Sequence, residues 1–433
     1  MKKMGMQLLC GMFAAALLLS GCSSSQSGQS GSGSGGEGVG NTQGEQVELI
    51  MYSWRPEDKK AYEKFIAAFE KENPTIKVTF KPFKSTEYNT ILTNTLTSGT
   101  GADIVQLRPY QGTKTMADAG YLVPLDDVKG VSDIQQAYLD AARGSDGNVY
   151  GVPLFLNNGV IFYNKQVFEE NNVQVPQTWD EFLDVSKQLQ SKGIVPVAQS
   201  GKAAYLLSMT HSVIGTTAYG GNDFVEKALK GEVNLKDPAF IQSIQRMADM
   251  ESFFPKDFIG IDDKDAQALF LTGKAAMYIN GSHRLQTFEK NNPDLPLDVI
   301  PTFAAEKGGT TPMTTWVDGS FGVVKSSKHQ EEAKKFMEFL ASKEFGQMYS
   351  DELNRVSAIS GVVPKHPLVK KMTELTEKSN TPYLMLVHFG DGTPTTKTTF
   401  ENALQGMYID QLTVEQVADE AQKSADKWFT PQK

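Results

Sequence analysis

Cysteine is almost absent from this chain. The 433 residues contain two cysteines, Cys10 and Cys22, so the sequence from residue 23 onward has no thiol. This excludes disulfide bonds, thiolate-bound metals and a cysteine nucleophile from that part of the chain. Histidine is also scarce, and its five copies are scattered along the sequence, which weakens any hypothesis of a histidine-based metal site.

The chain also lacks a cluster of basic residues. Its formal net charge is −9, and removal of Lys2 and Lys3 with a leader would make it −11. Because a nucleic-acid-binding protein normally presents a basic face, this composition argues against nucleic acid as a partner. No phosphate-binding loop, dinucleotide fingerprint or His-x-x-x-His pattern is present, so the common nucleotide and zinc motifs are excluded as well.

The N-terminus carries a specific processing signal. Lys2 and Lys3 precede an apolar segment, residues 6–19, which ends in Leu19-Ser20-Gly21-Cys22. This pattern matches a bacterial lipoprotein signal, in which the cysteine thiol receives a diacylglyceryl group. The alternative is a transmembrane helix, but the segment is short for a span. We therefore expect a leader at residues 1–21, lipidation at Cys22, and a Ser- and Gly-rich tether at residues 22–46.

The length and the first periodic segments predict a two-domain α/β protein. A chain of 433 residues exceeds what one core usually supports. Residues 47–52 form an apolar run typical of a buried strand, and residues 57–72 carry one apolar helical stripe. Residues 76–80 alternate apolar and polar side chains, so the strand-helix-strand order predicts a parallel sheet.

Residues 151–165 form the segment around which the chain is organised. Two apolar runs flank Asn157 and Asn158, which predicts one long strand interrupted in its middle, as in a hinge. Buried amides are costly unless they form hydrogen bonds, and a sugar hydroxyl in a cleft would be a suitable partner. The alternative is a hairpin with its turn at Asn157, Asn158 and Gly159.

Four segments together resemble a known family. They are Phe162-Tyr163-Asn164-Lys165, Pro176-Gln177-Thr178-Trp179, residues 96–105 and residues 119–126. They are similar to the extracellular solute-binding proteins of sugar ABC importers, of the maltose- and multiple-sugar-binding type. The resemblance implies a two-lobed, periplasmic-binding-protein-like α/β fold with a ligand cleft between the lobes.

A second crossing segment fits this resemblance. Residues 314–325 look like the return crossing of the family, with glycines before an apolar strand. The two crossings predict noncontiguous lobes. Lobe 1 would contain residues 47–156 and 320–363, and lobe 2 would contain residues 157–319 and 364–433.

Candidate ligand-binding residues follow the strands, because ligands of open α/β sheets lie beyond the carboxyl ends of the strands. Trp54 follows the first predicted strand, and Arg108 and Tyr110 follow the third. The aromatic rings could stack on a sugar, and the guanidinium could donate to hydroxyls. The alternatives are core packing for the two rings and a surface ion pair for Arg108.

Further candidates come from the crossings and from the turn at residues 280–283. The family often has tryptophan at this turn, where this chain has His283, so hydrogen bonds replace a stacking surface there. Asp318 could accept paired hydroxyls or could be a turn residue before Gly319. The full predicted set of ligand-binding residues is Trp54, Arg108, Tyr110, Asn157, Asn158, Asn280, Gly281, Ser282, His283, Trp316, Asp318 and Arg355.

These features predict a binding protein without catalytic activity. The expected ligand is a mono- or oligosaccharide, delivered by a monomeric, lipid-anchored protein on the outer face of the cell membrane to the permease of an ABC importer. No cofactor or metal is expected, because Asp262, Asp263 and Asp265 fit helix capping better than a calcium loop. The alternatives are a non-sugar solute, or a surface glycosidase with two suitably spaced carboxylates.

Overall fold

The computed structural model describes residues 46–431. The predicted leader, Cys22 and all of the tether except Gln46 lie outside the described residues. Within residues 46–431, no helix combines the length and the apolar character that crossing a membrane requires.

The chain begins with a parallel sheet. Strand β1 (Val47–Ser53) pairs in parallel with β2 (Ile76–Pro82) and with β3 (Ile104–Leu107). Helix α1 (Lys59–Glu72) connects β1 to β2 and buries one face, because its apolar residues recur at helical spacing. The predicted strand-helix-strand unit is therefore confirmed.

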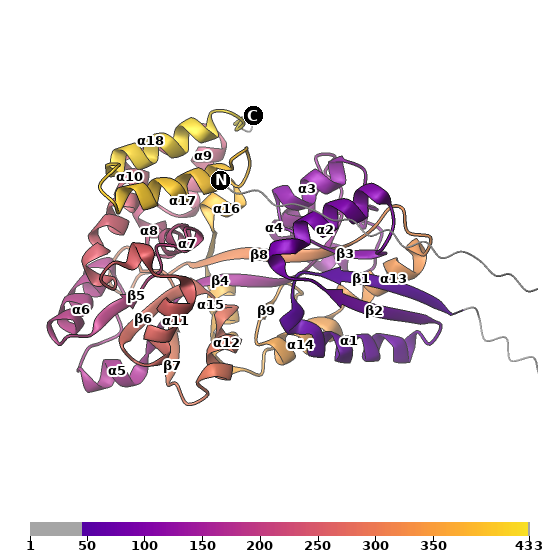
Figure 1. Ribbon diagram of the computed structural model, residues 1–433, viewed down its shortest axis with the longest axis horizontal. Helices are drawn as coiled ribbons and strands as arrows, with labels where there is room; N and C mark the ends of the chain where they lie inside the picture. The colour runs from indigo at the N-terminus through magenta and orange to yellow at the C-terminus, as the bar shows by residue number, and fades with distance from the viewer. Residues whose placement is uncertain (1–45, 432–433) are drawn as a thin grey trace, which may run out of the picture. The chain divides into compact units, whose positions relative to one another are not determined.

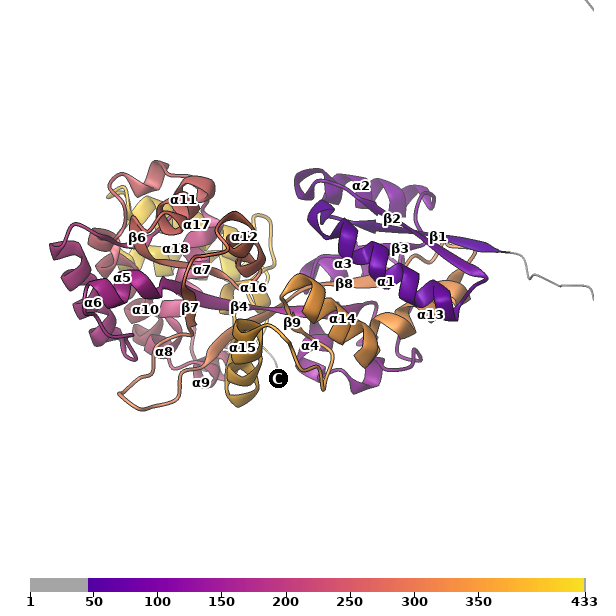
Figure 2. The same ribbon diagram turned by 90° about the horizontal axis from the view of Figure 1, so that it is seen from below.

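Two long antiparallel strands link this sheet to the rest of the chain. They are β4 (Val152–Asn164) and β8 (Met313–Val323). At one end of β8, residues 320–323 pair with β3, and at the other end residues 313–315 pair with β10 (Asn380–Pro382). Figures 1 and 2 show β4 and β8 passing between two groups of helices and strands. The fold is mixed α/β with two lobes.

Strand β4 continues through its polar centre. Asn157 lies opposite Trp316, and Asn158 lies opposite Thr315, so both asparagines are paired with β8 and do not form a turn. The hairpin alternative is therefore wrong. A register shift between Pro153 and Leu156 disturbs the pairing just before the asparagines. Such bulges bend a strand and change the direction of neighbouring side chains.

The remaining strands extend the sheet, whose order is β2-β1-β3-β8-β4-β6-β5. Strands β7 and β9 pair with β4 outside this path. Their bounds are β5 (Val195–Ala198), β6 (Ala275–Gly281), β7 (Leu297–Ile300) and β9 (Val356–Ser357).

Separate apolar cores lie on the two sides of the crossing strands. In the first, Phe65 and Phe69 of α1 pack against Phe345 and Phe336. In the second, Phe240 of α10 packs within aromatic contact of Phe400 of α17. Each buried phenylalanine contributes roughly 1.5–3 kcal/mol relative to exposure. The exact division of the chain between the lobes stays a prediction.

Helices cover the sheet in both lobes (Figure 1). Besides α1, they are α2 (Ser85–Ser98), α3 (Gln111–Asp118), α4 (Gln136–Leu139), α5 (Lys165–Glu170), α6 (Trp179–Ser191), α7 (Tyr205–Ile214), α8 (Thr216–Tyr219), α9 (Asn222–Leu229), α10 (Pro238–Asp249), α11 (Asp263–Leu271), α12 (Arg284–Asn291), α13 (Gln330–Leu340), α14 (Lys343–Leu353), α15 (Pro367–Lys378), α16 (Leu384–Val387), α17 (Thr396–Met407) and α18 (Val414–Ala425).

The aspartate cluster at residues 262–265 has a structural role. The Asp262 side chain accepts a hydrogen bond from the Asp265 backbone N–H and so caps α11. Asp263 instead forms an ion pair with Arg284 at 2.5 Å. The capping interpretation is therefore confirmed for Asp262.

Candidate ligand-binding site

A cavity of about 750 Å³ lies over the crossing strands, and we call it the cleft cavity. Its volume is in the range of roughly 300–1,000 Å³ that small-molecule sites occupy. The residues come from the end of β1, the start of α2, the end of β3, α7, the turn after β6, and both crossing strands. They are Trp54, Arg55, Pro56, Glu57, Lys84, Ser85, Thr86, Arg108, Asn157, Tyr205, Met209, His283, Trp316 and Asp318.

The polar floor of this cavity joins both crossing strands. Asn157 Nδ2 donates a hydrogen bond of 2.5 Å to Asp318 Oδ1. Asn157 Oδ1 accepts from the His283 backbone N–H at 3.3 Å and lies 3.2 Å from His283 Nδ1. Because an amide oxygen can only accept, this contact assigns the proton of His283 to Nδ1. Nε2 is then left as a hydrogen-bond acceptor.

His283 is neutral near pH 7. Burial, followed by the nearby charge of Arg284, lowers the pKa of His283 to about 3. A neutral imidazole offers one donor and one acceptor, whereas an imidazolium offers two donors. Since Nδ1 donates to Asn157, the ring suits a ligand hydroxyl as the donor to Nε2.

Asp318 is held in its ionised form by Arg55. The Arg55 guanidinium donates directly to Asp318 Oδ2. Burial opposes the ionisation of Asp318, but nearby cationic groups, with Arg55 the largest contributor, bring the pKa of Asp318 below its ordinary value. Arg55 also approaches Glu57 at 3.3 Å. Arg55 was not among the predicted ligand-binding residues, although it directly follows Trp54 at the end of β1.

Trp54 and Arg108 form one packed unit. The Arg108 guanidinium lies 4.1 Å from the centroid of the Trp54 ring, a cation–π distance. Trp54 is only 4% exposed, and its ring meets Tyr88 edge to face at 5.4 Å. A Cβ at Gly319 would come within 2.7 Å of Trp54, so glycine is needed there for close packing. A sugar could stack on the face covered by Arg108 only after the guanidinium moves.

Trp316 lies between two cavities. Its ring is 6% exposed and contacts Tyr383 edge to face at 5.4 Å. It lines the cleft cavity and also a second cavity of about 830 Å³. Of the aromatic rings predicted to bind ligand, Trp316 is therefore the one that could contact molecules in both spaces.

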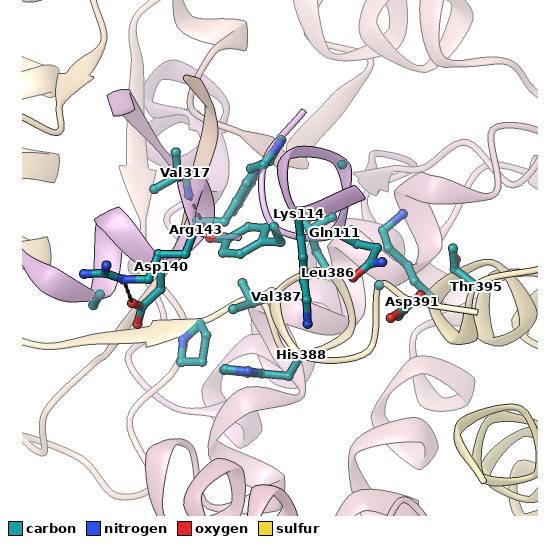
Figure 3. A pocket seen from close by; sticks show the side chains of 18 of the residues that line it. Gln111, Lys114, Asp140, Arg143, Val317, Leu386, Val387, His388, Asp391 and Thr395 are labelled. Carbon is teal, nitrogen blue, oxygen red and sulfur yellow. Dashed lines mark hydrogen bonds and ion pairs between the residues drawn. The ribbon is translucent and has the colours of Figure 1, made fainter. Parts of the chain in front are cut away.

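The second cavity follows an open edge of β8. Strand β3 pairs with β8 from Ser320 and β10 pairs with it up to Thr315, so neither covers the edge between them. The Tyr110 hydroxyl accepts a hydrogen bond of 3.1 Å from Val317 N–H at this edge. Figure 3 shows this cavity, with Lys114 pointing into it. Tyr110 thus lies in the second cavity and not in the cleft cavity.

Asn158 points to the opposite face of β4, as the twofold alternation of a strand requires. Its Nδ2 donates to Thr315 Oγ1 at 3.1 Å and to Thr376 Oγ1 at 2.8 Å. Its backbone N–H donates to Ser282 Oγ at 3.0 Å. Asn158 and Ser282 therefore support the crossing strands from behind the cleft cavity.

The remaining predicted residues also lie outside the lining of the cleft cavity. Asn280 Nδ2 donates to the Tyr278 hydroxyl at 2.6 Å. Gly281 leaves room for the ring of His283, because a Cβ there would approach Nδ1 to 2.7 Å. Arg355 forms a bidentate ion pair with Asp58 at 2.6 and 2.8 Å and is 4% exposed.

The two carboxylates of the cleft cavity share one cationic partner. Glu57 and Asp318 both contact Arg55. A glycosidase needs a general acid with a raised pKa, whereas the pKa of Asp318 is lowered. Residues 46–431 also contain no group of three histidine, cysteine or acidic side chains placed to hold a metal ion.

Known proteins resemble this chain over most of its length. The multiple sugar-binding protein of Streptococcus mutans serotype c is 26% identical over 382 residues, which cover 85% of this chain and 86% of that protein. The galactooligosaccharide-binding protein of Bacillus subtilis (strain 168) is 26% identical over 450 residues, covering 98% and 96% of the two chains. The structure of a chitin oligosaccharide binding protein superimposes with a TM-score of 0.74 at 24% identity, and the match covers 89% of this chain and 99% of that one.

The similarity to the solved structure concerns the fold alone. The family is assigned by a match over the sequence. Residues 53–347, more than half of the chain, match the family described as bacterial extracellular solute-binding protein. The chain therefore belongs to the bacterial extracellular solute-binding protein family.

Proposed function

We propose that this protein captures a mono- or oligosaccharide and delivers it to the permease of an ABC importer, without chemical change to the sugar. The observation that carries the proposal is the polar floor formed by Asn157, His283 and Asp318 beneath side chains of both lobes. Neutral hydroxyl groups match such a mixture of donors and acceptors. The multiple sugar- and galactooligosaccharide-binding proteins named above support the same ligand class.

Ligand binding would draw the lobes together by bending at the crossing strands. The proposed lobes are residues 47–156 with 320–363, and residues 157–319 with 364–433. The cleft cavity includes Arg108 from the first set and His283 from the second, so a ligand that contacts both favours the closed state. Small-angle scattering should give a smaller radius of gyration with bound ligand than without it.

A thermal-shift screen tests the function. A ligand that binds only the folded protein raises the melting temperature, by an amount that grows with its concentration relative to Kd. The panel would contain neutral and acidic mono- and oligosaccharides, with polyamines and peptides as controls. Stabilisation by saccharides alone is the expected result, and stabilisation by a control ligand alone would contradict it. Recovery of the bound sugar intact after prolonged incubation would exclude the glycosidase alternative.

We further propose that Cys22 is acylated and tethers the protein to the outer face of the cell membrane. The sequence Leu19-Ser20-Gly21-Cys22 supports this proposal. Substitution Cys22→Ser should release the protein from the membrane fraction or leave the precursor unprocessed. Unchanged lipid labelling of the Cys22→Ser protein would contradict the proposal.

A further inference from the structure

The charges that line the cleft cavity do not balance. The charged side chains are Arg55, Glu57, Lys84, Arg108 and Asp318, three cationic and two anionic. His283 adds no charge near pH 7, because burial lowers its pKa to about 3. The lining of the cleft cavity therefore has an excess of positive charge.

Both carboxylates of the cleft cavity form ion pairs with Arg55. Arg55 donates to Asp318 and lies 3.3 Å from Glu57. Asp318 also accepts from Asn157, so its two oxygens each have a partner. A cationic ligand would have to displace Arg55 to reach either carboxylate, which makes an amino sugar or a polyamine a poor match.

The excess charge is located on Arg108. Its hydrogen-bond partners are neutral: Asn89 Oδ1 at 3.3 Å, and Ser85 Oγ and backbone O at 2.9 and 3.3 Å. Across residues 46–431, no carboxylate lies within 4.0 Å of its nitrogens, whereas Arg55 has two carboxylate partners and Arg355 has one. Lys84 also has no ion pair with a carboxylate of the cleft cavity. It is exposed, and its Nζ lies 3.9 Å from Glu87.

The surroundings of Arg108 hold its guanidinium in place. The Trp54 ring covers one face at 4.1 Å, and the hydrogen bonds to Ser85 and Asn89 orient its edge. Burial, the largest influence, lowers the pKa of Arg108 from its ordinary value. Burial removes water from the guanidinium and so disfavours its charged form, and a bound anion would offset this cost. An oriented guanidinium loses little side-chain entropy on binding. A carboxylate that displaced the 3.3 Å bond from Nη2 to the Ser85 carbonyl would receive two parallel hydrogen bonds, from Nη1 and Nη2.

We infer that the ligand of the cleft cavity is an acidic saccharide, a uronic acid or an oligosaccharide containing one, whose carboxylate binds Arg108. The inference rests on the proposed function of saccharide capture and makes its ligand class more specific. The hydroxyls of the same sugar would contact Asn157 and His283, so the two lobes would recognise different groups of one ligand. A carboxylate is favoured over a sulfate ester because its two oxygens lie in one plane, as do the N–H groups of a guanidinium.

Calorimetric titration with matched sugars tests this inference. The pairs are galacturonic acid with galactose, glucuronic acid with glucose, and their short oligomers, together with galactose 6-sulfate. The acid should bind about tenfold to a hundredfold more tightly than its neutral partner, as expected for hydrogen bonds to a charged group. This preference should decrease with added salt, because the ion pair is screened.

Variants assign the preference to one side chain. Arg108→Gln should bring the affinity for the acid close to that for the neutral sugar. Arg108→Lys keeps the charge and tests the fork geometry; it should retain part of the preference even if Arg108→Gln is poorly folded. Lys114→Gln removes a cation from the second cavity and should leave the preference unchanged.

The outcomes distinguish this inference from the proposed function. Equal or tighter binding of the neutral sugars by the parent protein would overturn the acidic-ligand inference and leave saccharide capture intact. Preference for galactose 6-sulfate over both uronic acids would overturn the carboxylate assignment. Failure of the complete panel of neutral and acidic saccharides to bind would overturn both.

Discussion

The crossing strands present two polar regions that contain the same residue types in different surroundings. In the cavity region, Asn157 and Arg108 line the cleft cavity, although both also form hydrogen bonds within the protein. In the support region, Asn158 and Arg355 lie outside the lining of this cavity and bind only protein groups. An asparagine or an arginine near a hinge is therefore not informative by itself. The direction of the side chain and the charge of its partner decide between ligand binding and structural support.

The largest expected effect is in the support region, at the Asp58–Arg355 pair. Arg355→Met leaves the Asp58 carboxylate buried without its bidentate partner and should cost about 3–5 kcal/mol of folding free energy. Urea unfolding of the purified variant measures this loss. The double variant Asp58→Leu, Arg355→Met should recover much of the stability, because it removes both buried charges. A single variant as stable as the parent would show that this pair does not support the fold.

The next effect is the loss of stability in Asn158→Ala. Asn158→Ala removes donors to the hydroxyls of Thr315 and Thr376 inside the protein and should cost about 1–3 kcal/mol. Those hydroxyls themselves donate to backbone carbonyls, so they lose only an accepted hydrogen bond. The measurement is again urea unfolding, with Asn157→Ala in parallel. Stability of Asn158→Ala equal to that of the parent would contradict the support role of Asn158.

Trp316 tests the cavity region through affinity. Trp316→Ala should weaken saccharide binding by about 1–3 kcal/mol, the range of aromatic stacking on planar ligands. This corresponds to roughly tenfold to a hundredfold in Kd. The control is Trp179→Ala, because Trp179 stacks on Phe182 at 5.4 Å away from both cavities. Equal affinity losses in the two variants would indicate an indirect effect on the fold.

The last effect, which appears only as the pH is lowered, is the pH dependence contributed by His283. Its pKa is about 3 in the folded protein and 6.5 ordinarily, so the unfolded state binds more protons between these values. The free energy of unfolding should therefore decrease as pH falls from about 6.5 toward 3. His283→Gln should show a shallower decrease in urea titrations at pH 7, 6 and 5. An unchanged slope would mean that His283 takes up a proton in the folded state.

The crossing strands themselves could be predicted from the sequence, whereas the direction of their side chains could not. Apolar runs on both sides of Asn157 and Asn158 indicated one long strand. Every residue of β4 is buried, so no alternation of polar and apolar residues reveals which asparagine faces the cavity. The register shift between Pro153 and Leu156 also changes which residues of β4 lie opposite which residues of β8, and the sequence does not show this shift.

The partners of the two arginines depend on contacts distant in sequence. Asp58 and Arg355 are 297 residues apart and meet only because the chain returns to the first lobe after β8. Arg55 was visible at the end of the first predicted strand, but its pairing with Asp318 joins positions 263 residues apart. The aromatic ring of Trp54 was a clearer sequence signal of sugar binding than Arg55. In the structure, however, the Arg108 guanidinium covers one face of that ring.

Titration of one saccharide into three proteins tests the central claim, which is that the cleft cavity binds the ligand. The saccharide would be the one that stabilises the parent protein most in the thermal-shift screen, and the proteins are the parent, Asn157→Ala and Asn158→Ala. We expect Asn157→Ala to bind about tenfold to a hundredfold more weakly, since it loses hydrogen bonds at the cavity floor. Folded Asn158→Ala should bind nearly as tightly as the parent. Unchanged affinity in Asn157→Ala, with both variants folded, would contradict the claim.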